Sequence, residues 1–251
     1  MQLPSGHAIV SVVVPCLNEA EAIGPLVLEI LAEGVDEVVV VDNGSTDATA
    51  KAAAAAGARV VFEPVRGYGR ACAAGVASVR SDCDIVAFLD GDGSDVPAFL
   101  PQVADEVASS RADFAMGSRL KGRREPGSMT PQQLVAGRIA GLLMQAAYGV
   151  TFSDMSPFRA MRLASLRDLG MAETTYGWNL EMQMRVAAAG FSCVERPVDH
   201  RCRRGGVSKV SGNLRAGLAA AGKITTTFLR LWWQLRSRSV ASSTHARQAL
   251  G

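Results

Sequence analysis

Short runs of apolar, largely β-branched residues alternate along the first half of the chain with longer stretches rich in alanine. Apolar runs of about five residues are typical of strands buried on both faces, and the alanine-rich stretches are long enough to form helices. The predicted strands are 9–14, 37–41, 59–63, 85–89 and 114–118. This alternation predicts an α/β domain, in which helices cover both faces of a mostly parallel sheet.

The pattern changes after the fifth strand. A loop rich in Gly, Arg and Pro at 119–130 precedes a predicted helix at 131–149. A short strand near 158–161, a helix at 178–189 and a strand at 192–198 follow. The second half of the chain is therefore expected to continue the same domain.

Polar residues of the kind that cap helices precede three of the predicted helices. Asn18 lies before the first helix, Ser45 and Asp47 before the second, and Asp95 ahead of Pro97. Their side-chain oxygens are expected to accept hydrogen bonds from free backbone amides, and proline fits the first helical turn.

The region 213–236 has apolar residues three or four positions apart, which form one stripe on a helix. They are Leu214, Leu218, Ala221, Thr225, Phe228, Trp232 and Leu235. A basic amphipathic helix of this kind suits the headgroup region of a membrane, and the alternatives are packing against the domain or formation of a homodimer. We expect a domain at 1–212, this helix at 213–236 and a disordered tail at 237–251.

The net charge of +2 hides an asymmetry along the chain. From Arg196 onward there are eleven Lys and Arg residues and one Asp, whereas the preceding part is acidic on balance. A cationic C-terminal region favours phosphate groups or an anionic membrane surface as partners, and a solvated basic tail is the alternative. We expect no nucleic-acid partner.

The cysteines and the N-terminus indicate the compartment. Five cysteines, an odd number without paired metal-ligand spacing, favour reduced thiols in a cytosolic protein. The apolar run 8–14 leads directly into Pro15 with no basic segment before it, so it predicts a strand and not a signal peptide. No apolar run reaches the roughly 18 residues that a membrane-spanning helix needs. The expected location is the cytoplasm, with peripheral attachment to the inner face of the membrane.

Two carboxylates follow the buried strand 85–89 in the sequence Asp90-Gly91-Asp92. Side chains alternate between faces along a strand, but the chain turns at Gly91, so both Asp90 and Asp92 are able to face one hard divalent cation. This arrangement predicts a Mg²⁺ or Mn²⁺ site that carries a diphosphate. The alternative is an ordinary Asp-Gly turn after a strand.

Polar residues also follow the first two strands. Ligands of parallel α/β sheets gather at the carboxyl ends of the strands, so residues 15–19 and 42–47 are expected beside the Asp pair. Asp42 is a candidate for holding a base or a ribose, and the loop 66–70 offers amides and positive charge to an anion. The sequence has no Gly-x-Gly-x-x-Gly after the first strand and no Gly-Lys-Ser/Thr loop, which argues against a dinucleotide-binding dehydrogenase and excludes a P-loop.

Four segments, taken together and in order, resemble the family-2 glycosyltransferases of GT-A (Rossmann-like) fold, most closely the dolichyl-phosphate (polyprenyl-phosphate) mannose or glucose synthase branch. They are Val14-Pro15-Cys16-Leu17-Asn18-Glu19, Val41-Asp42-Asn43-Gly44-Ser45-Thr46-Asp47, Asp90-Gly91-Asp92 and Gly117-Ser118-Arg119. The resemblance covers about residues 9–213. It implies an inverting, metal-dependent enzyme that moves a hexose from a GDP- or UDP-linked donor to a polyprenyl phosphate.

The resemblance also implies roles for single residues. For the nucleotide sugar it implies Pro15, Leu17, Asn18, Glu19, Asp42, Asp90, Gly91 and Asp92, with Asp90 and Asp92 at the metal and Asp92 counted as catalytic. For the donor or acceptor phosphate it implies Arg119, also counted as catalytic, and the segment Arg203-Arg204-Gly205-Gly206-Val207-Ser208-Lys209, in which Arg203, Ser208 and Lys209 match the family.

The acceptor is left open between two classes. A phosphate acceptor is already anionic near neutral pH and needs cations to position it, whereas a hydroxyl acceptor, on a glycan or small metabolite, needs a general base. Glu181 is the candidate base, because many members of the wider family carry an acidic residue there; the alternative is a helix carboxylate that is exposed or paired with an arginine. From another class, a non-catalytic nucleotide-sugar binding module is the alternative.

The chain departs from the family pattern in places. Gly93 offers no side chain where the branch usually has a residue that assists the metal, and Asp95 is the expected substitute. The Gly-Phe/Tyr pattern before the acceptor strand is missing, and Arg159 there is expected either to add a cation or to pair with Asp154. His200 is predicted to be structural, with phosphate binding as the alternative.

Overall fold

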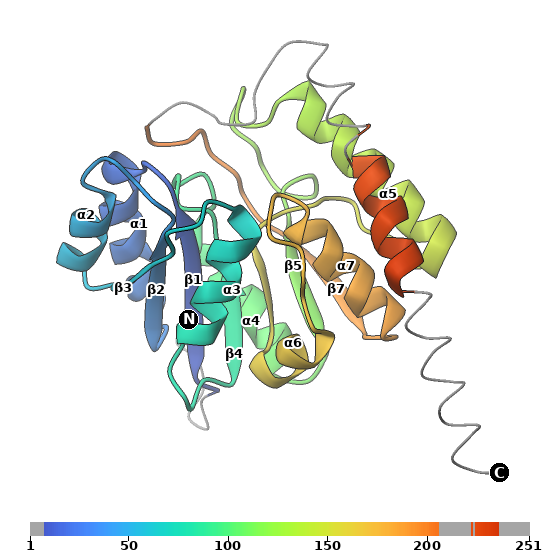
Figure 1. The fold of residues 1–251 in the computed structure, drawn as a ribbon, viewed down its shortest axis with the longest axis horizontal. Coiled ribbons are helices and arrows are strands. Elements are labelled where there is room, and N and C mark those ends of the chain that lie inside the picture. The colour runs from blue at the N-terminus through green and yellow to red at the C-terminus, as the bar shows by residue number, and fades with distance from the viewer. Residues whose placement is uncertain (1–7, 206–221, 223, 236–251) are drawn as a thin grey trace.

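The computed structural model describes residues 8–205, 222 and 224–235, which contain a seven-stranded sheet (Figure 1). Its order is β3-β2-β1-β4-β6-β5-β7, and β6 alone among these strands runs antiparallel to its neighbours. The strands are β1 (Val10–Cys16), β2 (Glu37–Asp42), β3 (Arg59–Phe62), β4 (Ile85–Phe88), β5 (Phe114–Ser118), β6 (Arg159–Arg162) and β7 (Cys193–Pro197). The predicted mostly parallel α/β sheet is confirmed.

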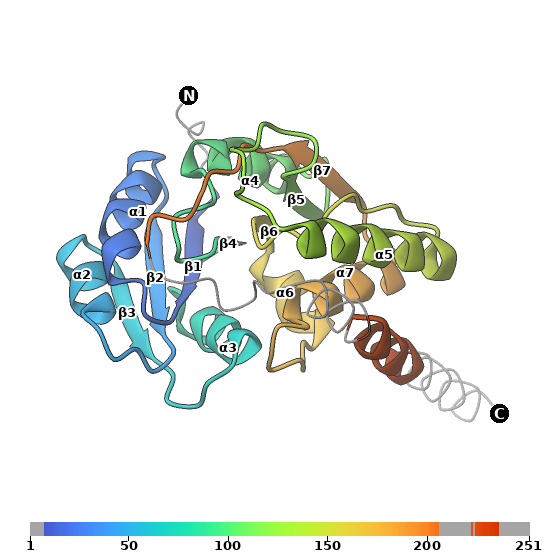
Figure 2. The same cartoon turned by 90° about the horizontal axis from the view of Figure 1, so that it is seen from above.

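Helices cover both faces of this sheet. They are α1 (Ala20–Ala32), α2 (Thr49–Ala55), α3 (Tyr68–Ser78), α4 (Leu100–Ala108), α5 (Pro131–Tyr148), α6 (Leu163–Leu169) and α7 (Trp178–Ala188), with a 3₁₀ turn η1 (Pro97–Phe99) before α4. Figure 2 shows α1 and α4 on one side of the sheet and α3 and α6 on the other. Helix α6 follows β6 directly and was not predicted.

Two apolar cores result, one on each face. Along β1 the side chains alternate, so that Val12 and Val14 join the core under α1, α2 and α4, whereas Val13 joins the core under α3, α5, α6 and α7. All three side chains are fully buried. Burial on both faces explains why the strands are continuous apolar runs in the sequence.

Two of the predicted helix caps are wrong. Asn18 has φ 56° and accepts a hydrogen bond from the backbone amide of Thr46, in the loop after β2. Asp95 accepts from the backbone amide of Asp90 and caps neither η1 nor α4. The Asn18 side chain joins the loops after β1 and β2, and the Asp95 side chain closes the loop after β4.

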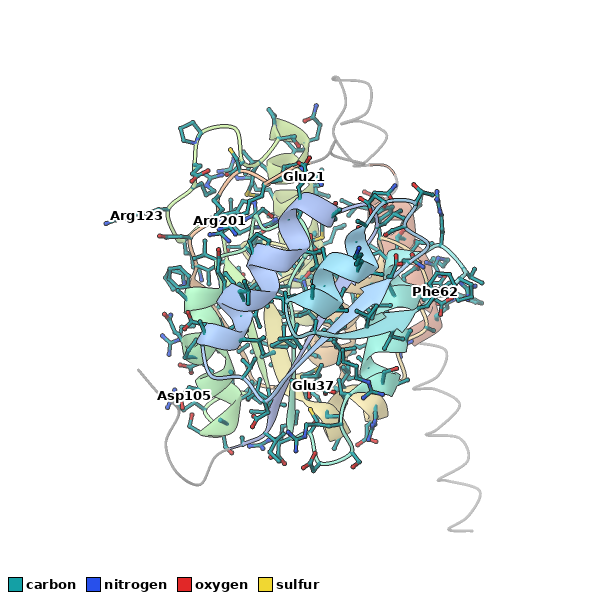
Figure 3. The ribbon with its side chains drawn as sticks, turned by 90° about the vertical axis from the view of Figure 1, so that its left-hand side faces the viewer. Glu21, Glu37, Phe62, Asp105, Arg123 and Arg201 are labelled. Atoms are coloured by element: carbon teal, nitrogen blue, oxygen red, sulfur yellow. The ribbon has the colours of Figure 1, made fainter. Side chains whose placement is uncertain are left out.

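The segment 198–205, after β7, crosses back over the carboxyl ends of the strands toward α1 (Figure 2). Its backbone is held on the way, because the amide of Arg201 donates to Ser94 and the amide of Arg204 donates to the carbonyl of Asp92 at 3.0 Å. The side chain of Arg201 lies beside α1 (Figure 3), where it donates to Glu29 at 2.6 Å. This crossing places the start of the basic loop over the end of β4.

Residues 224–235 form a helix that packs against the core on the α7 side of the sheet. Phe228 and Leu231 are buried there, whereas Leu229 and Trp233 are 53% and 71% exposed. This helix is therefore apolar on the packed face and keeps two large apolar side chains on the other. Residues 213–221, 223 and 236 of the predicted helix and the predicted tail 237–251 lie outside the described residues.

Candidate active site

A cleft of about 650 Å³ opens at the carboxyl ends of β1, β2 and β4. Predicted site residues from three distant parts of the sequence line it: Pro15, Leu17, Glu19, Asp90, Gly91, Asp92 and Arg203. The other lining residues include Asn43, Arg66, Gly67, Tyr68, Gln133, Thr175, Tyr176 and Asn179. The strand order explains why these distant residues lie together, because β1 lies between β2 and β4 in the sheet.

The close approach of two strand ends depends on Gly91. A Cβ atom at this position would lie 2.3 Å from Sγ of Cys16 and 3.1 Å from the carbonyl oxygen of Pro15. A side chain of any size would therefore push the loop after β4 away from the loop after β1. The glycine lets the carboxylates on either side of it reach the floor of the cleft.

The two predicted cation ligands differ in their surroundings. Asp90 accepts a hydrogen bond from the hydroxyl of Tyr68 at 3.0 Å, and Asp92 accepts from the backbone amide of Ser94 at 2.9 Å. Burial and the nearby carboxylates of Asp92 and Asp95 raise the pKa of Asp90 to about 8. A buried carboxyl group that resists ionisation in this way is stabilised in its charged form by a cation.

The donor set fits Mg²⁺ or Mn²⁺ that also binds a substrate. Among the residues that the structure describes, no three His, Cys, Asp or Glu side chains converge on a common point. Mg²⁺ is usually held by one or two carboxylates together with substrate phosphates and water, so a pair such as Asp90 and Asp92 suffices. Such a site would complete its coordination only with a diphosphate in the cleft.

Neither Gly93 nor its expected substitute, Asp95, extends this pair. Gly93 has φ 73°, and a Cβ there would meet the side chain of Arg204 at 3.1 Å, so the turn itself favours glycine. Asp95 is buried beneath the loop and lies 3.8 Å from Nδ1 of His200. Asp95 does not line the cleft. It accepts a hydrogen bond from the Asp90 amide, and its negative charge raises the pKa of Asp90.

Arg203 brings positive charge to the cleft. Its guanidinium donates to Glu19 at 2.8 Å and to the carbonyl of Gly205 at 2.8 Å, and it lies 4.0 Å from the carboxylate of Asp92. A guanidinium in this position is able to turn toward a diphosphate next to Asp92. The predicted ligands Ser208 and Lys209 lie outside the described residues.

Asn18 and Asp42 lie just behind the lining. The backbone amide of Asn18 donates to the Ser45 hydroxyl at 2.9 Å, and Asp42 accepts from the Ser45 amide at 2.8 Å. Glu19 is joined to the same region through its amide, which donates to Thr49 at 2.8 Å. These bonds fasten the loop after β1 to the loop after β2. Direct contact of Asn18 or Asp42 with a nucleoside stays a prediction.

Asn43 is a site residue to which the sequence analysis assigned no role. Its Nδ2 donates to the carbonyls of Glu63 and Val65, and its Oδ1 accepts from the amide of Gly67 at 2.7 Å. The side chain thereby shapes the loop that carries Arg66 into the cleft. Its position after a buried strand indicated a place near the cleft. Its hydrogen-bond partners could not be predicted in the same way, because they are 20 or more residues away in the sequence.

The structure places Arg119 outside the cleft lining. Its guanidinium forms two hydrogen bonds of 2.8 Å with Asp154, and both side chains are buried. The predicted direct contact with a phosphate disagrees with this geometry, because the donating face of Arg119 is taken by Asp154. Its positive charge opposes part of the rise in the pKa of Asp90, so Arg119 influences the cleft without lining it.

Glu181 is also outside the lining, and it is fully buried. It accepts from the backbone amides of Ala172 and Glu173 and forms an ion pair of 2.8 Å with Arg185. The geometry disagrees with the predicted role as general base and matches the alternative of a carboxylate paired with an arginine. Glu181 holds the chain that leads to Thr175 and Tyr176 in the cleft wall.

Comparison with known proteins identifies the family. The sequence profile described as glycosyl transferase family 2 matches residues 11–170. The chain belongs to glycosyl transferase family 2. The predicted resemblance to this family is thereby confirmed, and so is the prediction of a glycosyltransferase enzyme.

Relatives of this glycosyltransferase extend over most of its length. An uncharacterised glycosyltransferase of Mycobacterium tuberculosis is 40% identical over 215 residues, 84% of this chain and 94% of that protein. The undecaprenyl-phosphate mannosyltransferase of Micrococcus luteus is 31% identical over 244 residues, 90% of this chain and 97% of that protein. The polyprenyl-phosphate branch named from the sequence is thus represented among its relatives.

A solved structure shares the fold. Glucosyl-3-phosphoglycerate synthase from Mycobacterium tuberculosis, in complex with Mn²⁺, UDP-glucose and phosphoglyceric acid, is similar with a TM-score of 0.68. The sequences are 24% identical, and the match covers 90% of this chain and 80% of that chain. The predicted GT-A fold is confirmed.

Two further predictions for this glycosyltransferase concern buried basic side chains. Arg159 donates to the carbonyls of Ser156 and Asn179, and its guanidinium lies 5.7 Å from the centre of the Phe114 ring. It is 1% exposed, which disagrees with the predicted contact with an acceptor, and the carboxylate of Asp154 forms its ion pair with Arg119 instead. His200 is buried, and burial together with Arg119 lowers its pKa to about 4, which agrees with the predicted structural role.

Proposed function

We propose that this glycosyltransferase transfers a hexose from a nucleoside-diphosphate sugar to a polyprenyl phosphate, with inversion at the anomeric carbon. The observation that carries the proposal is the meeting of Asp90, Asp92 and Arg203 in one cleft, opposite the loops that follow β1 and β2. The loops at Pro15 and Leu17 accommodate the nucleoside, and the carboxylates lie where the diphosphate ends. The bound UDP-glucose of the solved GT-A structure supports this class of donor.

The charged residues in and behind the cleft have separate roles in this proposal. Asp90 and Asp92 would hold Mg²⁺ or Mn²⁺, which would supply positive charge next to the leaving diphosphate. Arg203 adds a second positive charge to the same oxygens and is kept near them by Glu19. Arg119 offsets the mutual repulsion of the carboxylates from behind. The residues lower the barrier by stabilising charge that develops on the leaving group.

The carboxylates of the cleft support a phosphate as the acceptor. Among the described lining residues these are Glu19, Asp90 and Asp92, and each of them already has a role toward Arg203 or the cation. Glu181 is buried against Arg185. A phosphate oxygen attacks without losing a proton in the transition state, so it requires no general base. The relative named undecaprenyl-phosphate mannosyltransferase supports the same acceptor class.

Transfer to a hydroxyl is the second candidate, because the solved structure with the shared fold binds phosphoglyceric acid. This acceptor also carries a phosphate, which Arg203 is able to attract. The two candidates therefore differ in the attacking atom, a phosphate oxygen or a hydroxyl oxygen. A direct assay with both acceptors separates them.

We also propose peripheral attachment to the inner face of the membrane, since a polyprenyl phosphate is held in a bilayer. Within the described part of the chain, no helix combines the length and the hydropathy required to cross a membrane. Leu229 and Trp233 are exposed on helix 224–235, and they are suited to the interface between headgroups and acyl chains. The basic C-terminal region adds attraction to anionic lipids.

The test is incubation of the purified protein with labelled UDP-hexoses and GDP-hexoses and either a polyprenyl phosphate or 3-phosphoglycerate. We expect a chloroform-soluble labelled product that disappears when a chelator removes divalent metal. Label transferred to 3-phosphoglycerate alone would replace the lipid proposal by the hydroxyl acceptor. Donor binding in calorimetry without any transfer would favour the non-catalytic binding module.

Asp92→Asn provides the internal check, because it removes one charge and preserves the shape of the side chain. We expect loss of turnover with a retained fold. Asp82→Asn is the matched control, since Asp82 pairs with Arg80 on the surface, outside the cleft. Full activity of Asp92→Asn would contradict the role of the carboxylate pair.

A further inference from the structure

Tyr68 is a cleft residue that contacts two distant parts of the sequence. Its hydroxyl donates to Oδ1 of Asp90 at 3.0 Å. Its ring stacks on the ring of Tyr176, with centroids 6.2 Å apart and an angle of 22° between the planes. Tyr68 is therefore fixed at one end by a predicted cation ligand and on one face by a residue 108 positions away.

Tyr176 belongs to the segment 171–177, which we call the Tyr176 loop. Glu173 shapes this loop, because its carboxylate accepts from the amide of Thr175 at 3.1 Å and from the Thr175 hydroxyl at 2.7 Å. The carbonyl of Thr174 accepts from the amide of Arg70 in the first turn of α3. The Tyr176 loop is therefore joined to the same helix end that carries Tyr68.

Two glycines make this contact possible. A Cβ at Gly69 would lie 2.1 Å from the carbonyl oxygen of Glu173, and a Cβ at Gly67 would lie 2.3 Å from that of Thr174. The loop therefore lies directly on the backbone of α3, without side chains between them. This explains the Gly-Tyr-Gly sequence better than an anion site does, since the approach is occupied by carbonyl oxygens.

The other side of the Tyr176 loop is held by helix 224–235. Arg230 forms an ion pair with the same Glu173 carboxylate that shapes the loop. The side chain of Thr227 lies against Gly177, where an added Cβ would be 3.1 Å from its methyl group. Phe228 and Leu231 anchor the helix in the core. The loop is clamped between α3 and this helix.

We propose that Tyr68 is a positioning residue for Asp90, and that helix 224–235 keeps Tyr68 in place through Arg230, Glu173 and Tyr176. The proposal rests on the proposed function only in taking Asp90 as a cation ligand. The Tyr68 hydroxyl occupies one carboxylate oxygen of Asp90 and leaves the other to the cation. The stack on Tyr176 holds the phenol ring, and Arg230 holds the loop that supplies Tyr176.

The link assigns different tasks to neighbouring exposed side chains of one helix. Arg230 acts on the cleft through Glu173, whereas Leu229 and Trp233 are proposed to contact a membrane. Substitutions of Arg230 and of Trp233 should therefore have separate effects. Arg230→Gln should change the cleft in the absence of lipid, and Trp233→Ala should not.

The experiment measures equilibrium binding of Mn²⁺ to the full chain in the presence of UDP, from the electron paramagnetic resonance signal of free Mn²⁺. We expect Asp90→Asn to lose binding. Tyr68→Phe keeps the ring and loses the hydroxyl, and should bind about tenfold more weakly, as for a lost hydrogen bond to a charged group. Tyr176→Ala and Arg230→Gln should weaken binding about threefold, because the ring of Tyr68 is then less restrained.

Conservative variants distinguish positioning from general damage. Tyr176→Phe retains the stack and Arg230→Lys retains the charge, so both should bind Mn²⁺ nearly as the unaltered protein does. Arg80→Gln removes an exposed ion pair beyond the other end of α3 and should leave binding unchanged. Thermal unfolding of each variant verifies that the fold is intact.

The outcomes are distinguishable. Normal Mn²⁺ binding by Tyr68→Phe, with binding lost in Asp90→Asn, overturns the role of Tyr68 and leaves the proposed function intact. Weak binding by Tyr68→Phe with normal binding by Arg230→Gln and Tyr176→Ala overturns the contribution of the helix. Normal binding by Asp90→Asn overturns both this inference and the cation site of the proposed function.

Discussion

The guanidinium of Arg203 lies 2.8 Å from the carboxylate of Glu19, although 184 positions separate the two residues in the sequence. The pair joins the segment after β7 to the loop after β1. Both side chains line that cleft, and Asp92 lies 4.0 Å from the same guanidinium. A diphosphate that enters beside Asp92 would meet a cation already in place.

Arg203→Gln is expected to reduce kcat/KM for the nucleotide sugar by about a hundredfold, because it removes a positive charge that is directed at the leaving group. Arg203→Lys should lose less, since it keeps the charge but not the fork of donors. Steady-state kinetics with donor as the varied substrate measure both. Arg196→Gln, which breaks a pair with Glu106 away from the cleft, is the control. Equal losses in Arg203→Gln and Arg196→Gln would refute this role.

Cation binding should strengthen as pH rises to about 8. Burial and the carboxylates of Asp92 and Asp95 raise the pKa of Asp90 to about 8, so a cation must displace a proton at lower pH. In the metal-free protein a rise in pH has an unfavourable effect, because it lowers the stability of the folded state. Because the folded state holds this proton more tightly than the unfolded state, Asp90 makes unfolding easier as pH rises from about 4 to about 8.

Thermal unfolding with and without Mn²⁺ at several pH values measures both effects. The increase in Tm that Mn²⁺ causes should grow from pH 5.5 to pH 8 and then level off. Asp90→Asn should remove most of that growth. A Mn²⁺ effect of the same size at every pH would show that Asp90 is ionised throughout this range.

Gly91→Ala is expected to destabilise the protein by about 1–3 kcal/mol, because the new methyl group overlaps Sγ of Cys16. Adding Cys16→Ala removes the atom in the way, so the double variant should be more stable than the sum of the single effects predicts. Urea unfolding of the four proteins in this cycle provides the interaction energy. Strict additivity would mean that the two residues do not touch.

Asp154→Asn should cost about 3–5 kcal/mol of unfolding free energy, because it leaves the buried guanidinium of Arg119 without a counter-charge. Urea unfolding checks this value. Asp82→Asn, at an exposed pair, should have little effect. If the two variants unfold at the same urea concentration, the buried pair does not contribute as expected.

Trp233→Ala and Leu229→Ala should weaken co-sedimentation with anionic liposomes, and added salt should weaken it further. Both side chains are more than half exposed on helix 224–235. Phe62→Ala is the matched control, because Phe62 is 65% exposed on β3 at the edge of the sheet (Figure 3). Absence of sedimentation at low salt would assign this helix to packing alone.

The strands and the carboxyl-end motifs could be predicted from the sequence, since both depend on local order along the chain. Burial on both faces produces continuous apolar runs, and the residue after each run must lie at one edge of a parallel sheet. Pro15, Glu19 and Asp92 were found in this way. The antiparallel insertion of β6 between β4 and β5 has no such local signal, because it depends on which strands pair.

Only the tertiary structure decided the partners of charged and aromatic side chains. Arg119 matches a family motif, yet its guanidinium binds Asp154, and Glu181 binds backbone amides and Arg185. The stack of Tyr68 on Tyr176 likewise joins residues that are distant in the sequence. A side chain's type limits what it is able to bind, but its partner is set by which segments the packed fold brings within hydrogen-bond distance, and a buried charge must pair with a group found there.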